Sequence, residues 1–511
     1  MTDVDRESVC NWRSAASDLT NKETTTVANE LWISSPELQT PQSTTSNKLK
    51  SIMTPIHEAE RTLRSTAEGP SSSVVQLNIS LQHSAKMVTI PFYSSSVKLM
   101  LFTWMVVILL SPSTAAPIQI TFDGCIPGFA NNETQYCCPP KYNGTIVDFI
   151  PEKELNSSKP LRVRKALQCL SKKEQREYKA KLDKAYTILR NLPEDDPRSL
   201  HQHGILHCAY GTGALVQPGT NITIDIHFSW LFYPFHRWFV YFHERILQNI
   251  LEDPEFSIHF WNWDNGATVR KPKSSHGGCY KVGHFLPQVY NDSSTAQYEA
   301  QRSYRAVMSD LPVDLSIIPE ERADPPLRTA DVALPRNVAS MYVAMMLNGS
   351  TTRGFMGGEY RVGDTQVLDP LTRAGSLEVM GHASGHWWVG GPFGLVQTSA
   401  LDPLFFAHHS NIDRLWNNWY NLPGGERKDY DDPDFLNAEY LFWDETATLR
   451  RVTVRDSLSI EALGYTYEKA NDAYWINYVL PVNGTTNSTT NVTTSTKALE
   501  EVHFPMRWNK V

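Results

Sequence analysis

Four stretches of the chain carry apolar residues at helical spacing. In the clearest, residues 171–192, an apolar stripe runs between charged faces. Ser171 is its candidate N-cap, and "PEDDP" ends it. The stripe consists of Tyr178, Leu182, Ala185 and Leu189. We expect three further helices, within residues 229–252 (starting near Pro234 and stopping before Asp253), 377–388 and 403–420.

The remaining segments after residue 117 carry weaker signals. Residues 264–375, with their Gly and Pro, indicate long loops and short elements, and residues 449–458 alternate as a strand does. The Thr-rich segment 482–497 is of low complexity, which is typical of a linker. Together these patterns predict a mainly α-helical fold with long loops and a small C-terminal appendage.

The N-terminal part differs in composition. Residues 1–86 are rich in Ser, Thr and Asn without a sustained apolar period, so we expect them to be disordered, or untranslated if Met87 is the true start. Residues 87–116 look like a secretory signal peptide, because Lys98 precedes an apolar run too short for a comfortable membrane span. A signal-anchor helix is the alternative. We expect no stable membrane insertion after signal removal.

Sequons and cysteines agree with secretion to the vacuole, cell wall or extracellular space. Cys125, Cys137 and Cys138 follow the expected cleavage point closely. Adjacent cysteines cannot easily bridge each other and must reach elsewhere, and Cys208 is one available partner. Glycosylation sequons follow the cleavage point at Asn132, Asn143, Asn156, Asn221, Asn291, Asn348, Asn483, Asn487 and Asn491.

Composition excludes one class of partner. The chain has 511 residues, of which 41% are hydrophobic and 14 are Trp, so it can bury a large core. Its net charge of −8 provides no basic footprint for DNA or RNA, and we expect no nucleic-acid partner.

The arrangement of the histidines is the most informative feature. His382 and His386 are four residues apart and share one helix face. His227 and His236 flank Pro234, which breaks a helix and lets the two rings converge. A single histidine among aromatic residues is more often a hydrogen-bonded core residue than a ligand. Two such pairs in aromatic segments reverse that expectation and predict a metal site.

A further pair and one more histidine complete the set. His408 and His409 are adjacent, and successive helical residues point about 100° apart, so only one of them can face a site. Asp413, four residues after His409, is expected to accept a ring N–H and to fix the ring's orientation. With His207 there are three ligands before residue 240 and three after residue 380, which fits two three-imidazole sites.

The donor set restricts the metal. Imidazoles without carboxylate or thiolate ligands suit copper, and zinc less decisively. A zinc peptidase would carry a Glu between paired histidines, which "HASGH" lacks, while magnesium and calcium prefer oxygen ligands. We therefore expect two copper ions that react with dioxygen inside a shell of aromatic side chains.

From Cys125 to about Tyr478 the sequence resembles the plant-type polyphenol oxidases, the type-3 dicopper family of catechol oxidases and tyrosinases. The resemblance rests on "HCAY", "HFSWLFYPFHRWFVYFHERIL", "FWNWD" and "DPLFFAHHSNIDRLW". It implies two disulfides, Cys125–Cys138 and Cys137–Cys208. It implies that His408 is not a ligand, and that the two coppers bind His207, His227 and His236, and His382, His386 and His409.

The resemblance also assigns residues around the ligands. Glu378 matches a carboxylate that orients a water near the second copper. Ala383 stands where some relatives carry an Asn that helps to deprotonate a phenol, which favours diphenol oxidation here. Val396 stands where a bulky Phe often overhangs the first copper, which predicts a wider mouth. Gly211 replaces a cysteine that the family joins to the second ligand by a thioether, so His227 has no covalent tether.

We expect a four-helix-bundle catalytic domain at 117–440, a short middle domain at 441–480, and a linker and tail at 481–511 without the family's shielding domain. The expected activity is oxidation of a small phenolic substrate, an o-diphenol, to an o-quinone with reduction of dioxygen to water. A tyrosinase that also hydroxylates monophenols, an oxygen carrier and a zinc hydrolase are the alternatives. Relatives with plastid transit peptides leave the plastid lumen as the alternative compartment.

Overall fold

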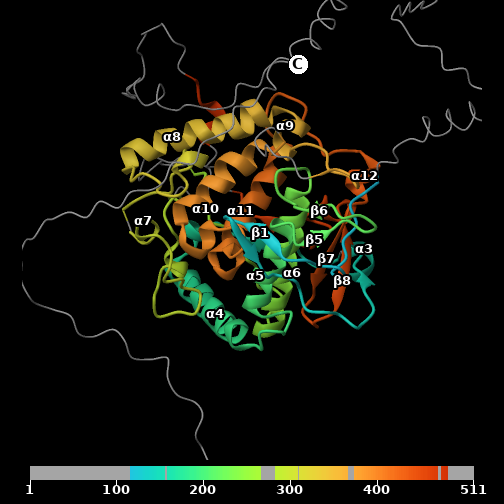
Figure 1. The fold of residues 1–511 in the computed structure, drawn as a ribbon. Helices are drawn as coiled ribbons and strands as arrows, with labels where there is room; N and C mark the ends of the chain where they lie inside the picture. Colours follow the sequence, from blue (N-terminus) through green and yellow to red (C-terminus); the bar gives the residue numbers. More distant parts are fainter. Residues whose placement is uncertain are drawn as a thin grey trace, which may run out of the picture. The chain divides into compact units, whose positions relative to one another are not determined.

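The computed structural model describes residues 116–155, 158–265, 282–308, 310–365, 373–469 and 474–480 (Figure 1). The expected N-terminal extension, the Thr-rich linker and, except for Ala116, the expected signal peptide lie outside these ranges. Within them, no helix combines the length and apolar character that a membrane span requires.

The fold is mainly helical, as the sequence predicts. Four helical segments lie together at its centre and carry all the expected ligand histidines except His227, which lies in the loop before α6 (Figure 1). They are α5 (Leu200–Gly211), α6 (Phe232–Leu251), α10 (Ala383–Val389), which follows a π-helical turn at Glu378–His382, and α11 (Leu404–Trp419). The longer helix α4 (Lys172–Asn191) packs against α5 and α6. Short helices α3 (Pro151–Glu154), α7 (Tyr304–Val307), α9 (Thr352–Met356) and α12 (Pro433–Leu436) connect the larger elements.

Helix α4 forms where its local signals place it. Ser171 Oγ accepts a hydrogen bond from the backbone N–H of Glu174, and the Glu174 carboxylate accepts one from the N–H of Ser171. This reciprocal cap satisfies two N–H groups that a helix start otherwise leaves without partners. All four residues of the predicted stripe are buried, together with Tyr186.

Helix α6 is the buried centre of the molecule. The expectation that Pro234 breaks a helix between His227 and His236 was wrong. The helix begins at Phe232, after His227, so Pro234 lies in its first turn, where the missing N–H costs no helical hydrogen bond. The helix ends at Leu251, and the capping residue Glu252 has a left-handed backbone with φ 55°. Because α6 is surrounded on nearly all sides, its buried residues include polar ones, among them His236, Arg237 and Glu244, as well as apolar ones.

Two of the longer helices were not predicted: α5, which carries His207, and one within residues 264–375. Residues 264–375 contain α8 (Ala330–Tyr342), continued by a π-helical turn at Val343–Leu347, although the sequence indicated only loops and short elements there. Pro335 lies inside α8, which removes a helical N–H and masks the pattern. The helix is held by a tertiary contact: the Asn337 amide donates to the carbonyl of Val313 and accepts from the N–H of Leu315, both at 2.7 Å.

Short strands fasten the C-terminal segment to the start of the domain. The strand predicted within residues 449–458 is β8 (Leu449–Thr453), which pairs antiparallel with β7 (Glu439–Trp443) and parallel with β3 (Val147–Asp148). Strand β9 (Tyr465–Tyr467) pairs parallel with β4 (Arg162–Arg164). The expected domain boundary at residue 440 falls inside β7. Two hairpins are separate: β1 (Gly128–Ala130) with β2 (Glu133–Gln135), and β5 (Leu215–Val216) with β6 (Thr223–Ile224).

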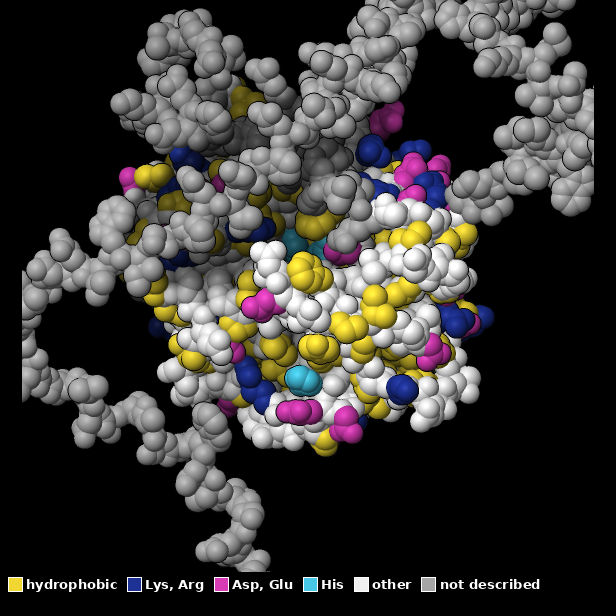
Figure 2. All heavy atoms as spheres, viewed as in Figure 1, with side chains coloured by type: hydrophobic (Ala, Val, Ile, Leu, Met, Phe, Trp, Pro, Cys, Tyr) yellow, Lys and Arg dark blue, Asp and Glu magenta, His cyan; other side chains and the backbone are white. Residues whose placement is uncertain are grey.

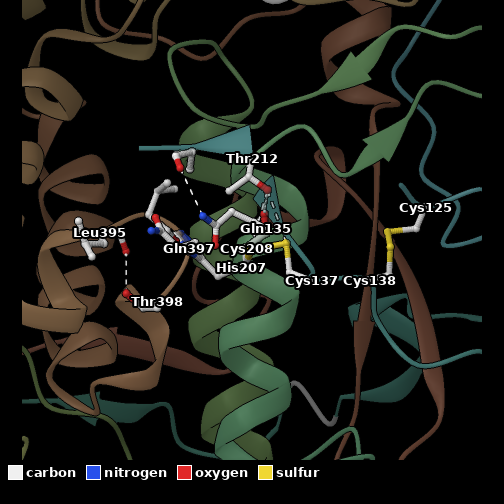
Figure 3. The surroundings of a disulfide bond; sticks show 12 residues. Cys125, Gln135, Cys137, Cys138, His207, Cys208, Thr212, Leu395, Gln397 and Thr398 are labelled. Carbon is white, nitrogen blue, oxygen red and sulfur yellow. Dashed lines mark hydrogen bonds between the residues drawn. A yellow bond between two sulfur atoms is a disulfide. The ribbon is translucent and has the colours of Figure 1, made fainter. Parts of the chain in front are cut away.

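Two disulfides hold the N-terminal segment (Figure 3). Cys125 is bonded to Cys138, and Cys137 is bonded to Cys208 in α5, the pairing that the family resemblance implied. The second bond joins residues 71 apart in sequence, so it restricts the unfolded chain as well as fastening β1–β2 beside α5. Cys169, which the sequence analysis left unassigned, is also disulfide-bonded.

A buried cluster of charges joins β9 to the central helices. Asp413 of α11 accepts hydrogen bonds from Arg237 of α6 and, at 3.3 Å, from Arg164 of β4. The hydroxyls of Tyr465 and Tyr467 donate to the same carboxylate. Burial alone would raise the pKa of Asp413, but the two arginines outweigh burial and lower it. The cluster therefore needs an ionised Asp413.

Replacing Asp413 by Asn should destabilise the fold, because two buried guanidinium groups would lose their counter-charge. We expect the free energy of unfolding, measured by urea denaturation at neutral pH, to fall by about 3–5 kcal/mol. Folding lowers the pKa of Asp413. The carboxylate therefore contributes its full stabilisation at pH values above its pKa in the unfolded chain, and this stabilisation is lost as the pH falls through its pKa in the folded chain. The control is Glu177→Gln, which removes the exposed Lys173–Glu177 pair and should leave stability unchanged. Equal stability of both variants would contradict the prediction.

Candidate metal centre

Two groups of histidines converge inside the helical bundle. The side-chain nitrogens within each group lie within 4.8 Å of one another. The first group takes one ring from α5, one from the loop before α6 and one from α6 itself: His207, His227 and His236. The second takes its rings from the π-turn, α10 and α11: His382, His386, His408 and His409.

The two groups face each other. The Nε2 atoms of His207 and His236 are 3.4 Å apart, and those of His386 and His409 are also 3.4 Å apart. His236 and His409 stack with their ring centroids 4.2 Å apart, which brings the groups into contact. Residues separated by more than a hundred positions in sequence thus form one site.

The opposite ring nitrogens are held by acceptors. A carbonyl or carboxylate oxygen can only accept, so a ring bonded to one carries its proton on Nδ1 and leaves the Nε2 lone pair free. Among the residues that the structure describes, Nδ1 of His409 has no partner. The Nδ1–H groups donate from His207 to the Val396 carbonyl, from His236 to that of Phe232, from His382 to that of Glu378, from His386 to that of Phe393, and from His227 to the Asp225 carboxylate.

This arrangement fits metal ions. Burial lowers the pKa of His207, His236, His382 and His409 well below the usual value and that of His386 to about 4, so the rings are neutral. Paired Nε2 lone pairs at 3.4 Å repel unless a cation lies near them. The donors are imidazoles alone, the set that suits copper.

The adjacent histidines of α11 have different surroundings. The His409 ring contacts His236 and therefore points toward the first group. The His408 ring lies against Trp263 and Phe393 and fits over Gly385, where an added Cβ would come within 2.8 Å of its Cε1 atom. His408 faces away from the first group, which supports His409 as the ligand.

The role expected for Asp413 was wrong. Its carboxylate bonds to arginines and tyrosines rather than to a histidine ring. The four-residue spacing from His409 places it one turn along α11, but there it meets α6, β4 and β9 instead of the metal centre. Asp413 stabilises the frame and does not orient a ligand.

Glu378 is buried beside both groups. One carboxylate oxygen accepts a hydrogen bond of 2.6 Å from the backbone N–H of Phe228, and the other has no partner in the described part of the chain. Burial, reinforced by the charge of Asp225, raises the pKa of Glu378. Phe228 has φ 59°, a strained conformation for a bulky residue, and this aims its N–H at Glu378.

The other predicted residues line the first group or the start of α10. Val396 is half-buried, and its methyl group occupies the space that a side chain at Gly211 would need. Gly211 lies against the ring of His227: an added Cβ would come within 2.9 Å of the ring's Cε1. Ala383 is the first residue of α10 and is half-buried. Figure 2 shows histidine side chains in a recess between hydrophobic side chains.

Sequence reasoning missed Asp225 and Phe228. The only available signal was an acidic residue two positions before His227 in an otherwise apolar segment. It also missed a hydrogen-bonded chain of buried side chains beside the centre, in which Tyr186 bonds to His243 and His243 to His203, each at 2.9 Å. Burial lowers the pKa of His203 to about 4, so this chain is neutral.

Comparison with known proteins agrees with the site. The common central domain of tyrosinase matches residues 195–422, and the polyphenol oxidase middle domain matches residues 429–480. The tyrosinase-type domain implies a dicopper centre, which the histidine groups fit.

Individual relatives are similar over most of the described chain. A latent chloroplastic polyphenol oxidase of Prunus armeniaca is 40% identical over 70% of this chain and 54% of its own length. The chloroplastic (+)-larreatricin hydroxylase of Larrea tridentata is 37% identical over 71% of this chain and 58% of its own length. The chain spans about half the length of such curated relatives. The crystal structure of Grenache (Vitis vinifera) polyphenol oxidase superposes with a TM-score of 0.60 at 35% identity, covering 70% of this chain and 99% of that one.

Matched replacements test which adjacent histidine binds metal. His408→Phe should leave two coppers per chain, because neither nitrogen of the His408 ring has a hydrogen-bond partner in the described ranges. His409→Phe should leave about one, since it removes a nitrogen of the second group. Atomic absorption on copper-loaded, desalted protein measures both. Loss of copper in the His408 variant alone would reverse the assignment.

Proposed function

The chain belongs to the plant-type polyphenol oxidase family of tyrosinase-like dicopper proteins, and on that premise we propose that it oxidises o-diphenols to o-quinones with dioxygen. Two diphenols are oxidised for each dioxygen, and two waters form, because dioxygen accepts four electrons and each diphenol supplies two. The finer assignment, catechol oxidase rather than another member of the family, is part of the proposal.

The observation that carries the proposal is the meeting of two histidine trios, in each of which two Nε2 atoms lie 3.4 Å apart. We assign His207, His227 and His236 to one copper, and His382, His386 and His409 to the other. When bound there, the copper pair supplies the exchange of two electrons at a time between a diphenol and dioxygen. The protein supplies neutral ligands in fixed orientations and a water-poor surrounding.

Aromatic side chains provide that surrounding. The ring centroids of Phe232 and His382 are 4.7 Å apart, and those of Phe405 and His409 are 4.1 Å apart. These rings keep bulk water from the ligands and resist compression, because they are packed between helices. A phenol ring entering the site finds flat apolar contacts of the kind that it prefers.

Val396 and Gly211 set the size of the approach in this proposal. Neither carries a bulky group over the first trio, and together they fill only the space beside His227. The wider mouth supports diphenols with large substituents as substrates. Ala383 has no side-chain amide, unlike the Asn that some relatives carry at this position. This supports diphenol oxidation over monophenol hydroxylation.

Glu378 is the proposed auxiliary base. Its second oxygen has no partner among the described residues and is available for a phenolic proton, directly or through one water. In the chain alone burial raises its pKa, but neighbouring cations act in the opposite direction and favour the carboxylate. Phe228 holds the other oxygen in place.

Monophenol hydroxylation is the second candidate. It uses the same proposed ligands, and the relative from Larrea tridentata is named a hydroxylase. For the compartment, the names of several relatives include "chloroplastic", which supports the plastid lumen rather than the secretory route. The secretory interpretation rests on residues outside the described ranges, and the N-terminal residue of the mature protein distinguishes the two compartments.

The central test is oxygen uptake by copper-loaded protein. We expect consumption of dioxygen with dopamine at two diphenols per dioxygen, and none after copper removal by a chelator. Tyramine should give little or no uptake, whereas uptake after a lag would assign the hydroxylase. Two bound coppers without turnover of any diphenol would exclude the oxidase.

Glu378→Gln should slow turnover without loss of copper. The amide can still accept the hydrogen bond from Phe228, but it cannot take a proton, so kcat/KM for dopamine should fall on the order of a hundredfold. Copper content is the control and should stay at two per chain. An unchanged kcat/KM would remove Glu378 from proton transfer.

A further inference from the structure

We propose that Asp225 is a positioning residue that holds His227 in the first trio by a charged hydrogen bond, in a chain where Gly211 provides no covalent tether. This inference rests on the proposed function, since it concerns the hold of the first trio on its metal. It assigns a role to a residue that neither the sequence pattern nor the family resemblance singled out.

His227 differs from the other proposed ligands in its backbone. It lies in the loop before α6, whereas His207 and His236 are in helices. A helical histidine can donate Nδ1–H to the carbonyl four residues earlier, as His236 does to Phe232 at 2.8 Å. His227 has no such helical carbonyl, so its orientation depends on another acceptor.

Asp225 provides that acceptor twice. Its Oδ1 atom accepts from Nδ1 of His227 at 3.0 Å and from the backbone N–H of His227 at 2.8 Å. Both side chains are largely buried, with 7% of Asp225 and 8% of His227 exposed. One oxygen therefore fixes the backbone and the ring of the ligand together. A carboxylate is a stronger acceptor than the carbonyls that serve the other ligands, and it makes the ring a better donor to a metal.

The space beside the ring explains why this bond matters here. An added Cβ at Gly211 would lie 2.9 Å from Cε1 of His227, so the chain passes close to the ring without holding it. The neighbouring rings of His207 and His236 have centroids 5.4 Å away, and they provide packing but no hydrogen bond to His227. Of the contacts found in the described residues, the bond to Asp225 is the one that selects the ring's orientation and places its proton.

The same loop couples the two trios. Phe228, directly after His227, donates its N–H to Glu378, and the Glu378 carbonyl accepts Nδ1–H of His382 at 3.2 Å. Movement of the loop would therefore disturb both His227 and Glu378. The strained backbone of Phe228 can persist only while contacts on both sides hold it, and Asp225 provides the contact on one side.

The test compares Asp225→Ala and Asp225→Asn in the copper-loaded full chain. We expect the first copper to be lost to a competing chelator at a free-ligand concentration about 10–100-fold lower in Asp225→Ala than in the unmodified protein. Asp225→Asn, which keeps an acceptor oxygen without the charge, should fall between the two. Electron paramagnetic resonance provides a second readout, because a lone cupric ion left in the second trio gives a signal that a coupled pair does not.

A matched control separates this role from general stabilisation. Asp444 makes the same kind of turn, with Oδ1 accepting from the N–H and hydroxyl of Thr446 two residues later, and it is also buried. Asp444→Asn should lower the thermal midpoint of the metal-free protein but leave copper retention unchanged.

Retention of both coppers in Asp225→Ala, with unchanged chelator resistance, would overturn the inference. So would equal copper loss in the Asp444 variant. Copper retention can be measured without turnover. If the unmodified protein oxidised no diphenol, the proposed function would fail, but the copper-retention comparison would still test the role of Asp225.

Discussion

Pairs of buried, unprotonated imidazole nitrogens 3.4 Å apart are the constraint on which the rest of this structure depends. Such nitrogens repel each other unless a cation lies near them. Their tautomers are set from outside, by oxygens that accept the protons of the opposite ring nitrogens. Metal binding is therefore coupled to folding: the site exists only when distant helices have brought donors and acceptors together.

The frame around the centre has to hold four helical segments in register. Helix α6 lies at the middle, and its aromatic residues fill the space to its neighbours on nearly every side. On one side, the Cys137–Cys208 bond fastens the N-terminal hairpin one residue after His207. On another, Asp413 and its arginines join α6, α11 and β4. These contacts hold the central helices together from outside the histidine groups.

Prediction from the sequence succeeded where the signal was local. Helix α4 was found because its cap and its buried stripe lie within one segment, and α11 because its aromatic spacing is regular. It failed for α5, and it failed for α8, whose interior Pro335 hides a helix that Asn337 anchors to a loop more than twenty residues away. Asp413 was misassigned for a related reason: a spacing of four residues identifies a shared face but not what packs against it.

The sequence by itself determined the chemical nature of the donors: six imidazoles in short aromatic segments, of which His382 and His386 are four residues apart on one helix face. Only the tertiary structure decided which of His408 and His409 faces the first trio, and that His227 depends on Asp225. It also decided the partner of His207, which is the carbonyl of Val396, 189 residues away. Periodicity is a property of a single segment, whereas a hydrogen-bond acceptor is chosen by packing among segments that are far apart in the chain.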